Sequence, residues 1–250
     1  MLEAILWDVD GTLAETERDG HLVAMTAAFT ELDVPWRWSE VRYGELLRVA
    51  GGFERLLSDM ESQPLAPVSL DERSVLARRI HALKNQRYKD LVASGALPLR
   101  PGVRELFDEC PAAGVRMAIV TTTSRGNVDA LLSAQVGADW EARLAAVVCA
   151  EDAPAKKPDP QAYRLVLERL QLSAEQTVAI EDSAMGLAAA TAVGVPVVIT
   201  RSIYFPDDPV RGALAVGPSL GTRAGWSPGL DGKPGRVALS DIRHWHESRR

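Results

Sequence analysis

Two aspartates near the start of the chain, Asp8 and Asp10, are spaced so that both carboxylates could act in one reaction. They belong to the run Asp-Val-Asp-Gly-Thr-Leu at residues 8–13, which follows a short apolar segment. Carboxylates this close repel each other unless a positive group lies between them or one of them holds a proton. One carboxylate could then attack an electrophile while the other donates a proton.

Three later segments supply the polar groups that such a site needs. They are Thr121, Thr122 and Thr123, then Lys157 directly before a proline, then the pair Glu181 and Asp182. Mg²⁺ prefers oxygen ligands and keeps several waters, so carboxylates from two strands and a phosphate oxygen suit it. Hydroxyl and backbone N–H donors, together with a lysine, suit the remaining phosphate oxygens. These residue types together predict a phosphoryl-transfer site with Mg²⁺ as its cofactor.

The polar segments are positioned by continuous apolar runs, which are typical of buried strands. The runs cover residues 4–9, 115–121, 145–149, 177–181 and 195–200. Continuous rather than alternating apolarity predicts strands that are covered on both faces, as in a parallel sheet. From residue 98 onward these runs alternate with helical patterns at 103–110, 163–170 and 185–193, which predicts a Rossmann-like, doubly wound α/β core. Ligands of such sheets bind beyond the carboxyl ends of the strands, where the polar groups fall.

Residues 15–97 lack a comparable apolar run and show amphipathic helical patterns instead. The patterns cover residues 22–32, 41–49, 52–60 and 70–92. They predict an all-helical cap domain inserted into an α/β core domain made of residues 1–14 and 98–250. Residues 217–235 contain six glycines and three prolines. This segment predicts a loose surface loop before a last short helix at 239–248.

The composition is that of an ordinary globular protein, with 46% hydrophobic residues, 25% charged residues and a net charge of −6. An acidic chain lacks the surplus of Lys and Arg that grips nucleic acid, so no nucleic-acid partner is expected. No uncharged apolar run could span a bilayer and no signal-peptide pattern is present, so we expect a cytoplasmic protein without a membrane partner. Cys110 and Cys149 are too few and too far apart for a disulfide framework, so we expect both to be reduced and buried.

The motifs, taken in order, resemble those of the haloacid-dehalogenase superfamily of phosphohydrolases. The four motifs of that superfamily match DVDGT, the threonine after a strand, the lysine before proline, and Glu-Asp-Ser at 181–183. The resemblance covers nearly the whole chain, including a helical cap inserted after the first motif. It implies that Asp8 takes the phosphoryl group as an aspartyl phosphate. It also implies that Asp10 protonates the leaving sugar oxygen and then deprotonates the attacking water.

The same resemblance assigns the remaining groups. Thr121 and the backbone of Thr122 would bind the phosphoryl oxygens, and Lys157 would neutralise negative charge. The metal ligands would be Asp8, the backbone carbonyl of Asp10, Asp182 and Glu181, with Glu181 either a direct ligand or an outer carboxylate.

Within the superfamily, the nearest resemblance is to sugar bisphosphate phosphatases associated with the Calvin cycle. It is carried by the segments at 14–17, 46–52 with 54–55, 97–102 and 156–158. It implies a small phosphorylated sugar as substrate, with xylulose 1,5-bisphosphate as a candidate. The residues available to grip the distal part of the sugar, each of which could also be a solvated helix residue, are Glu17, His21, Tyr43, Arg48, Gly51, Gly52, Glu54, Arg55 and Lys84, together with Thr123 on the core side. Phe53 and Leu22 stand where that group usually has lysine and arginine, which bears on the choice of sugar.

Three alternatives share parts of this pattern. A phosphosugar mutase of the same superfamily has the same two aspartates and the cap, and the sequence separates it poorly from a phosphatase. A non-enzymatic phospho-receiver domain has no use for a general acid two residues after its nucleophile, nor for the inserted residues. A true dehalogenase would leave Asp10 idle, because halide needs no proton when it leaves. We therefore predict a monomeric, Mg²⁺-dependent sugar phosphatase, with the mutase as the alternative.

Overall fold

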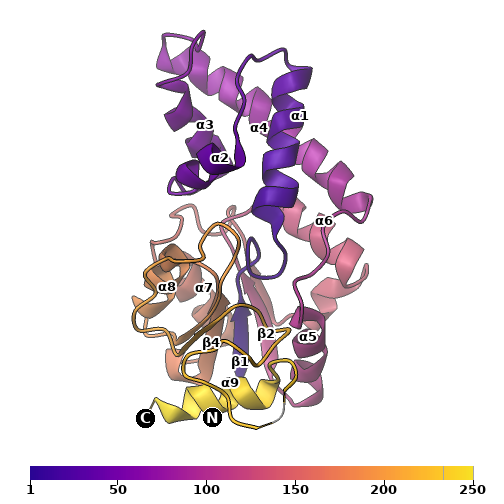
Figure 1. The fold of residues 1–250 in the computed structure, drawn as a ribbon, viewed down its shortest axis with the longest axis vertical. Helices are drawn as coiled ribbons and strands as arrows, with labels where there is room; N and C mark the ends of the chain where they lie inside the picture. Colours follow the sequence, from indigo (N-terminus) through magenta and orange to yellow (C-terminus); the bar gives the residue numbers. More distant parts are fainter. Residues whose placement is uncertain (233, 250) are drawn as a thin grey trace.

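The computed structural model describes residues 1–232 and 234–249, and a parallel six-stranded sheet lies at its centre (Figure 1). The strands are β1 (Ala4–Trp7), β2 (Arg116–Val120), β3 (Ala146–Val148), β4 (Thr177–Glu181), β5 (Val197–Thr200) and β6 (Ala215–Gly217), in the order β3-β2-β1-β4-β5-β6. The predicted α/β fold class is confirmed, and the five predicted strands are present, β4 with the predicted bounds and the other four with slightly shorter ones. Strand β6 was missed because it ends at Gly217, where the segment rich in glycine and proline begins.

Helices cover both faces of the sheet, as expected of a doubly wound fold. One face carries α5 (Val103–Ala112), α6 (Arg125–Gln135) and α9 (Leu239–Ser248), and the other carries α7 (Gln161–Leu170) and α8 (Ala184–Thr191). Two short 3₁₀ helices, η2 (Trp140–Arg143) and η3 (Ala174–Gln176), precede β3 and β4. Trp7 of β1 packs against Phe107 of α5, whereas Leu6 belongs to the cluster around Tyr163 of α7. Successive residues of β1 therefore fill opposite layers, which explains the continuous apolar run.

Four further helices stand beyond the carboxyl end of the sheet (Figure 1). A π-helical turn, η1 (Glu17–Leu22), leads into α1 (Val23–Glu31), followed by α2 (Glu40–Leu46), α3 (Gly52–Met60) and α4 (Leu70–Ala93). They share a hydrophobic cluster of their own that includes Phe29, Trp38 and Tyr43. Near its carboxyl end, α4 adds Tyr88 and Val92 to the cluster of the sheet. The four helical patterns therefore form a separate layer that still contacts the core.

Arg100 connects the two chain segments that join these helices to the sheet, one at residues 11–15 and the other at residues 98–100. Its backbone N–H donates to Leu13 O at 2.8 Å, and its guanidinium donates to Gly11 O and lies 3.1 Å from the Glu15 carboxylate. The same side chain donates to the carbonyl of Thr200 at 3.1 Å. The loop that follows β1 is thereby held by a buried cation.

The segment 217–235 is not the loose surface loop that its glycines and prolines predicted. Leu220 and Trp226 are buried in the cluster of the sheet, and the rings of Trp226 and Trp245 lie 4.8 Å apart. Trp226 Nε1 also donates to Thr222 O at 2.8 Å. The prediction was wrong because turn residues describe the backbone, whereas two apolar side chains fix the segment. Lys233, which falls within the predicted loop, lies outside the described residues.

Truncating this anchor is expected to be costly for the fold. Trp226→Ala removes a buried indole, so we expect the free energy of unfolding to fall by about 3–5 kcal/mol. Asp231→Ala, which changes an exposed side chain in the same segment, serves as the control. Urea unfolding followed by far-UV circular dichroism measures both variants. Equal midpoints for the two variants would contradict the anchoring role.

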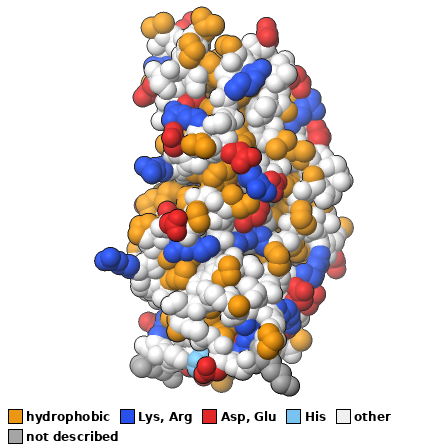
Figure 2. Space-filling model, viewed as in Figure 1, with side chains coloured by type: hydrophobic (Ala, Val, Ile, Leu, Met, Phe, Trp, Pro, Cys, Tyr) orange, Lys and Arg blue, Asp and Glu red, His pale blue; other side chains and the backbone are white. Residues whose placement is uncertain are grey.

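The remaining general expectations concern the surface and the cysteines. Figure 2 shows Lys, Arg, Asp and Glu side chains interspersed over the visible face of the molecule. Among the described residues, no helix combines the length and the apolarity that a membrane crossing requires. Cys110 and Cys149 are both buried with free thiols, as the sequence predicted.

Candidate active site

The first group of functional residues gathers where β1 and β4 end side by side. Lys157 Nζ donates to Asp8 Oδ1 at 2.7 Å, to Glu181 Oε1 at 2.6 Å and to the carbonyl of Val120 at 2.8 Å. Because β1 pairs with β4 in parallel register, the residues at their carboxyl ends are neighbours. Lys157 contacts Asp8, whereas the adjacent Lys156 pairs with Glu54.

Three buried carboxylates lie close enough to share one cation. Oxygens of Asp8, Glu181 and Asp182 all lie within 4.8 Å of one another. Burial, followed by the charge of Glu181, raises the pKa of Asp8 to about 7 although Lys157 opposes the shift. Burial and the charge of Asp8 raise the pKa of Asp182 well above its usual value. One lysine does not balance three carboxylates, so an oxygen-seeking divalent cation such as Mg²⁺ fits this donor set.

Two neighbouring residues shape this cluster without being predicted as site residues. Tyr163 donates its hydroxyl to Glu181 Oε1 at 2.5 Å. Gly11 adopts φ +81°, and a Cβ there would lie 2.1 Å from Asp182 Oδ2. The glycine of the DVDGT motif is therefore required both by its backbone conformation and by the close approach of Asp182.

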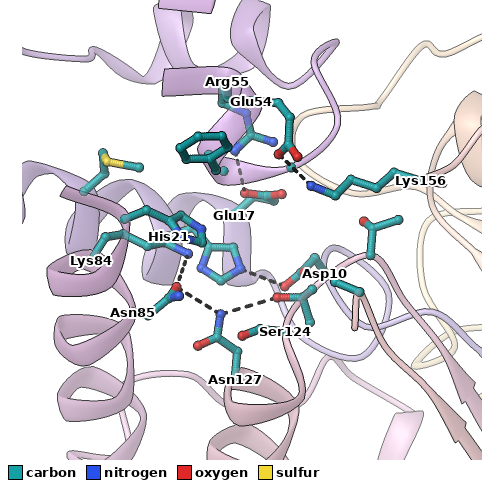
Figure 3. Close-up of a pocket in the computed structure, with 18 of the residues that line it drawn as sticks. Asp10, Glu17, His21, Glu54, Arg55, Lys84, Asn85, Ser124, Asn127 and Lys156 are labelled. Atoms are coloured by element: carbon teal, nitrogen blue, oxygen red, sulfur yellow. Dashed lines mark hydrogen bonds and ion pairs between the residues drawn. The ribbon is translucent and has the colours of Figure 1, made fainter. Parts of the chain in front are cut away.

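Asp10 directs its carboxylate away from this cluster and toward the cap (Figure 3). Its Oδ1 accepts a hydrogen bond from the Thr16 hydroxyl and lies 3.1 Å from His21 Nε2. Burial alone would raise the pKa of Asp10, but His21, Thr16 and Lys84 outweigh it and lower the pKa to about 2. The repulsion expected between Asp8 and Asp10 is thus relieved because each carboxylate has its own cationic or donor partners.

The three threonines after β2 take different positions. Thr121 is buried, and its hydroxyl accepts the backbone N–H of Thr123 at 3.2 Å. Thr122 lines the cavity on the side of Asp8 as well as on the side of the cap, and Thr123 lines the latter. Thr121 is not among the side chains that line either cavity, so its hydroxyl orders the turn that presents Thr122.

One cavity lies between helices α1–α4, called the cap below, and the core, and a second cavity lies at the carboxylate cluster. The two cavities are connected, since they share the lining residues Asp10, Glu17, Gly51, Arg55 and Thr122. Glu17 accepts a hydrogen bond from Tyr43, and Arg55 donates to the same tyrosine hydroxyl at 2.9 Å. The predicted cap residues that the structure brings to this cavity are Glu17, His21, Tyr43, Gly51, Gly52, Glu54, Arg55 and Lys84.

Arg48 is the predicted cap residue that the structure does not bring to the cavity. It is exposed and is not among the lining side chains, because α2 ends at Leu46 and the chain turns there. The expectation for Arg48 followed from its positive charge and from the resemblance carried by residues 46–52.

Several lining residues were missed by sequence reasoning. They are His81, Asn85, Ser124 and Asn127, whereas Lys156, which also lines the cavity, belongs to the segment 156–158 that carried the resemblance. His81, Lys84 and Asn85 are spaced so that they share one face of α4, which is a helical pattern of polar residues that could have been noticed. Ser124 and Asn127 carry no comparable signal, because their position depends on how α6 meets α4.

The fold and the carboxylate site together define a hydrolase of the haloacid dehalogenase type. The family model described as haloacid dehalogenase-like hydrolase matches residues 2–194, and the chain belongs to this family. It is a phosphatase similar to CbbY: the plasmid CbbY protein of Cupriavidus necator is 43% identical over 247 residues, covering 98% of this chain and 97% of that protein. The predicted resemblance to the haloacid-dehalogenase superfamily is confirmed, and within it the chain is similar to CbbY proteins.

Solved structures agree with this family. A mutant CbbY from Rhodobacter sphaeroides, in complex with xylulose 1,5-bisphosphate, is 38% identical with a TM-score of 0.77, covering 85% of this chain and 92% of that one. A putative β-phosphoglucomutase from Thermotoga maritima is 26% identical with a TM-score of 0.64, covering 86% and 94%. The fold is therefore shared by relatives described as phosphatases and as mutases.

Proposed function

We propose that this protein is a Mg²⁺-dependent phosphatase of a small phosphorylated sugar, working through an aspartyl phosphate on Asp8. Xylulose 1,5-bisphosphate, converted to xylulose 5-phosphate, is the substrate we favour. The observation that carries the proposal is that the two aspartates have different surroundings, each suited to a different role. Asp8 lies beside Lys157 among the carboxylates, and Asp10 points into the cavity that a sugar would fill. The complex of the related CbbY with this bisphosphate supports the choice of substrate.

In the first half of the reaction, an oxygen of Asp8 attacks phosphorus while the bond from phosphorus to the sugar oxygen breaks. Asp10 gives a proton to that oxygen as it leaves. In the second half, water attacks phosphorus, Asp10 takes its proton and the bond to Asp8 breaks. The proton that Asp10 takes from water in the second half is the one that it gives to the sugar oxygen in the next turnover, so the carboxyl group returns to its starting state. Lys157 holds the Asp8 carboxylate in place throughout.

The remaining site residues bind charge or exclude water. Asp8, Asp182, Glu181 and the Asp10 carbonyl would hold Mg²⁺, which neutralises charge on the phosphoryl oxygens. The backbone at Thr122 offers donors to the same oxygens. We assign residues 15–97 to a cap that covers the cavity and keeps bulk water from the phosphoenzyme.

Mg²⁺ is expected to stabilise the folded protein as well as to support turnover. Binding relieves the repulsion among buried carboxylates, so Mg²⁺ at about 100 times its Kd should add about 2.7 kcal/mol of stability. Thermal unfolding in EDTA and in Mg²⁺ measures this, and Asp182→Asn should lose most of the shift. Full phosphate release in EDTA, with no Mg²⁺-dependent change in Tm, would contradict the metal assignment.

Activity should fall in alkaline solution because Lys84 loses its charge there. Burial and Arg55 lower the pKa of Lys84 to about 8, while Glu17 and Asp10 oppose the shift and His81 lies on the same helix face. Below pH 8 the ammonium is present and attracts an anionic sugar. We expect kcat/KM to decline with an inflection near pH 8. In Lys84→Arg, which stays charged, this inflection should disappear, and an unchanged profile would rule out Lys84 as its origin.

The mutase alternative is tested by the products. Incubating the enzyme with a sugar monophosphate and Mg²⁺, then measuring free phosphate and the isomeric sugar phosphate, separates the two activities. Sequence identity favours the phosphatase, since this chain is 43% identical to the CbbY relative and 26% identical to the neighbour described as a putative mutase. Phosphate is expected without isomer, whereas isomer without phosphate would establish a mutase.

A further inference from the structure

Lys156 and Glu54 form an ion pair that joins the core to the cap across the substrate cavity. Lys156 precedes the catalytic lysine, and its Nζ lies 2.6 Å from the carboxylate of Glu54 at the start of α3. Both residues line the cavity that also contains Asp10 (Figure 3). The two adjacent lysines therefore diverge: Lys157 reaches the carboxylate cluster and Lys156 reaches the cap.

The other cations of the cavity are held more firmly than Lys156. Lys157 has three buried acceptors, and Arg55 donates to Tyr43 and to the carbonyl of Leu46 at 3.2 Å. Lys84 is almost fully buried above the ring of Tyr88. Glu54, the partner of Lys156, is 46% exposed. Exposed ion pairs are weak, so Lys156 is the cation that an incoming anion can most easily recruit.

The backbone beside this ion pair lets both charged groups approach it closely, because the nearest residue is a glycine. Gly51 adopts φ +93°, and a Cβ there would lie 2.1 Å from Lys156 Nζ and 2.2 Å from Glu54 Oε2. The ammonium thus lies directly against the surface of a glycine in the cavity wall. Phe53, next to the paired glycines, offers no charge of its own, and its ring faces Arg78 at 5.7 Å.

We propose that Lys156 is the specificity-determining residue for a second phosphate, and that Glu54 competes with that phosphate for it. The inference rests on the proposed sugar phosphatase function. Without substrate, Glu54 holds Lys156 across the cavity. When a bisphosphate binds with one phosphate at Asp8, its distal phosphate takes Lys156 from Glu54, because a phosphate dianion is the stronger charge-assisted acceptor. A monophosphate lacks the group that makes this exchange, so it gains nothing from Lys156.

The test compares xylulose 1,5-bisphosphate with xylulose 1-phosphate, using kcat/KM from phosphate release. For Lys156→Met, the preference for the bisphosphate should fall by about 10- to 100-fold, mainly through KM. Lys156→Arg should restore most of it. Glu54→Gln should raise the preference several-fold, since the competitor is neutralised. Lys89→Met removes the same charge from an exposed lysine that lines neither cavity, and it is expected to keep the preference of the native protein.

The outcomes separate this inference from the proposed function. If the native enzyme hydrolyses neither compound, the proposed function fails. If it hydrolyses the bisphosphate and Lys156→Met keeps the native preference, the role of Lys156 is refuted while the phosphatase stands. Should Lys156→Met fold poorly, the Glu54→Gln variant decides alone, and an unchanged or lower preference in that variant overturns the competition.

Discussion

Asp8→Asn should abolish turnover, with a loss of at least about 10⁴-fold in kcat, because no other carboxylate can take its place as nucleophile. Glu181 is engaged by Lys157 and Tyr163, and Asp182 lies just beyond the end of the neighbouring strand β4. An amide at position 8 cannot form a stable bond to phosphorus. Steady-state phosphate release with the favoured bisphosphate measures the loss.

The same substitution separates chemistry from folding. Burial and the charge of Glu181 raise the pKa of Asp8, and burial and the charge of Asp8 raise the pKa of Asp182, so a charged Asp8 is unfavourable in the metal-free protein. An amide removes one buried charge, and Lys157 keeps Glu181 as its partner. We therefore expect the Tm of metal-free Asp8→Asn to equal or exceed that of the native protein. A variant that keeps native turnover would exclude Asp8 as the nucleophile.

Asp10→Asn should lower kcat by about 10²- to 10⁴-fold, the usual contribution of a general acid and base. An amide neither protonates the sugar oxygen nor takes a proton from water, although its oxygen can still accept from Thr16. Substrate binding should persist, so the bisphosphate is expected to bind Asp10→Asn with an affinity close to the native value. Stopped-flow phosphate release and isothermal titration calorimetry measure the two effects.

A matched control for Asp10 is Thr16→Val. It removes one hydrogen bond to the carboxylate but leaves the acid itself, so we expect a smaller loss than for Asp10→Asn. If the two variants lose activity equally, the contribution of Asp10 is positional rather than acid–base. Unchanged turnover in Asp10→Asn would refute the acid role altogether.

The core of the site could be predicted because its geometry follows from the sheet. Asp8 and Glu181 lie at the ends of β1 and β4, so the apolar runs that mark those strands also fix where the polar groups meet. Because the DVDGT motif is short, it also fixes the positions of the second aspartate and of the glycine relative to Asp8. Motif order then added the roles through resemblance, and the structure places Lys157, the lysine directly before proline, beside Asp8.

The remainder depends on packing that no local pattern encodes. Arg48 follows the end of α2 and is exposed to solvent. The sequence does not show at which residue a short helix ends, so it does not show which way the next side chains point. Helix α6 was not predicted, so Asn127, which it brings to the cavity beside α4, was missed. Trp226 folds a glycine-rich segment back onto α9, although the turn residues around it suggested exposure. In each case the position is set by contacts between residues far apart in the chain.

The central claim is that Asp8 captures phosphorus, and a trapped phosphoenzyme tests it most directly. The enzyme is mixed with substrate and Mg²⁺ and quenched in acid within milliseconds. It is then digested, and the masses of its peptides are measured by mass spectrometry. We predict one added phosphoryl group on the peptide that contains Asp8, absent when Mg²⁺ is chelated and absent in Asp8→Asn. Phosphate release without any phosphorylated peptide, or a phosphoryl group on a different residue, would contradict the account.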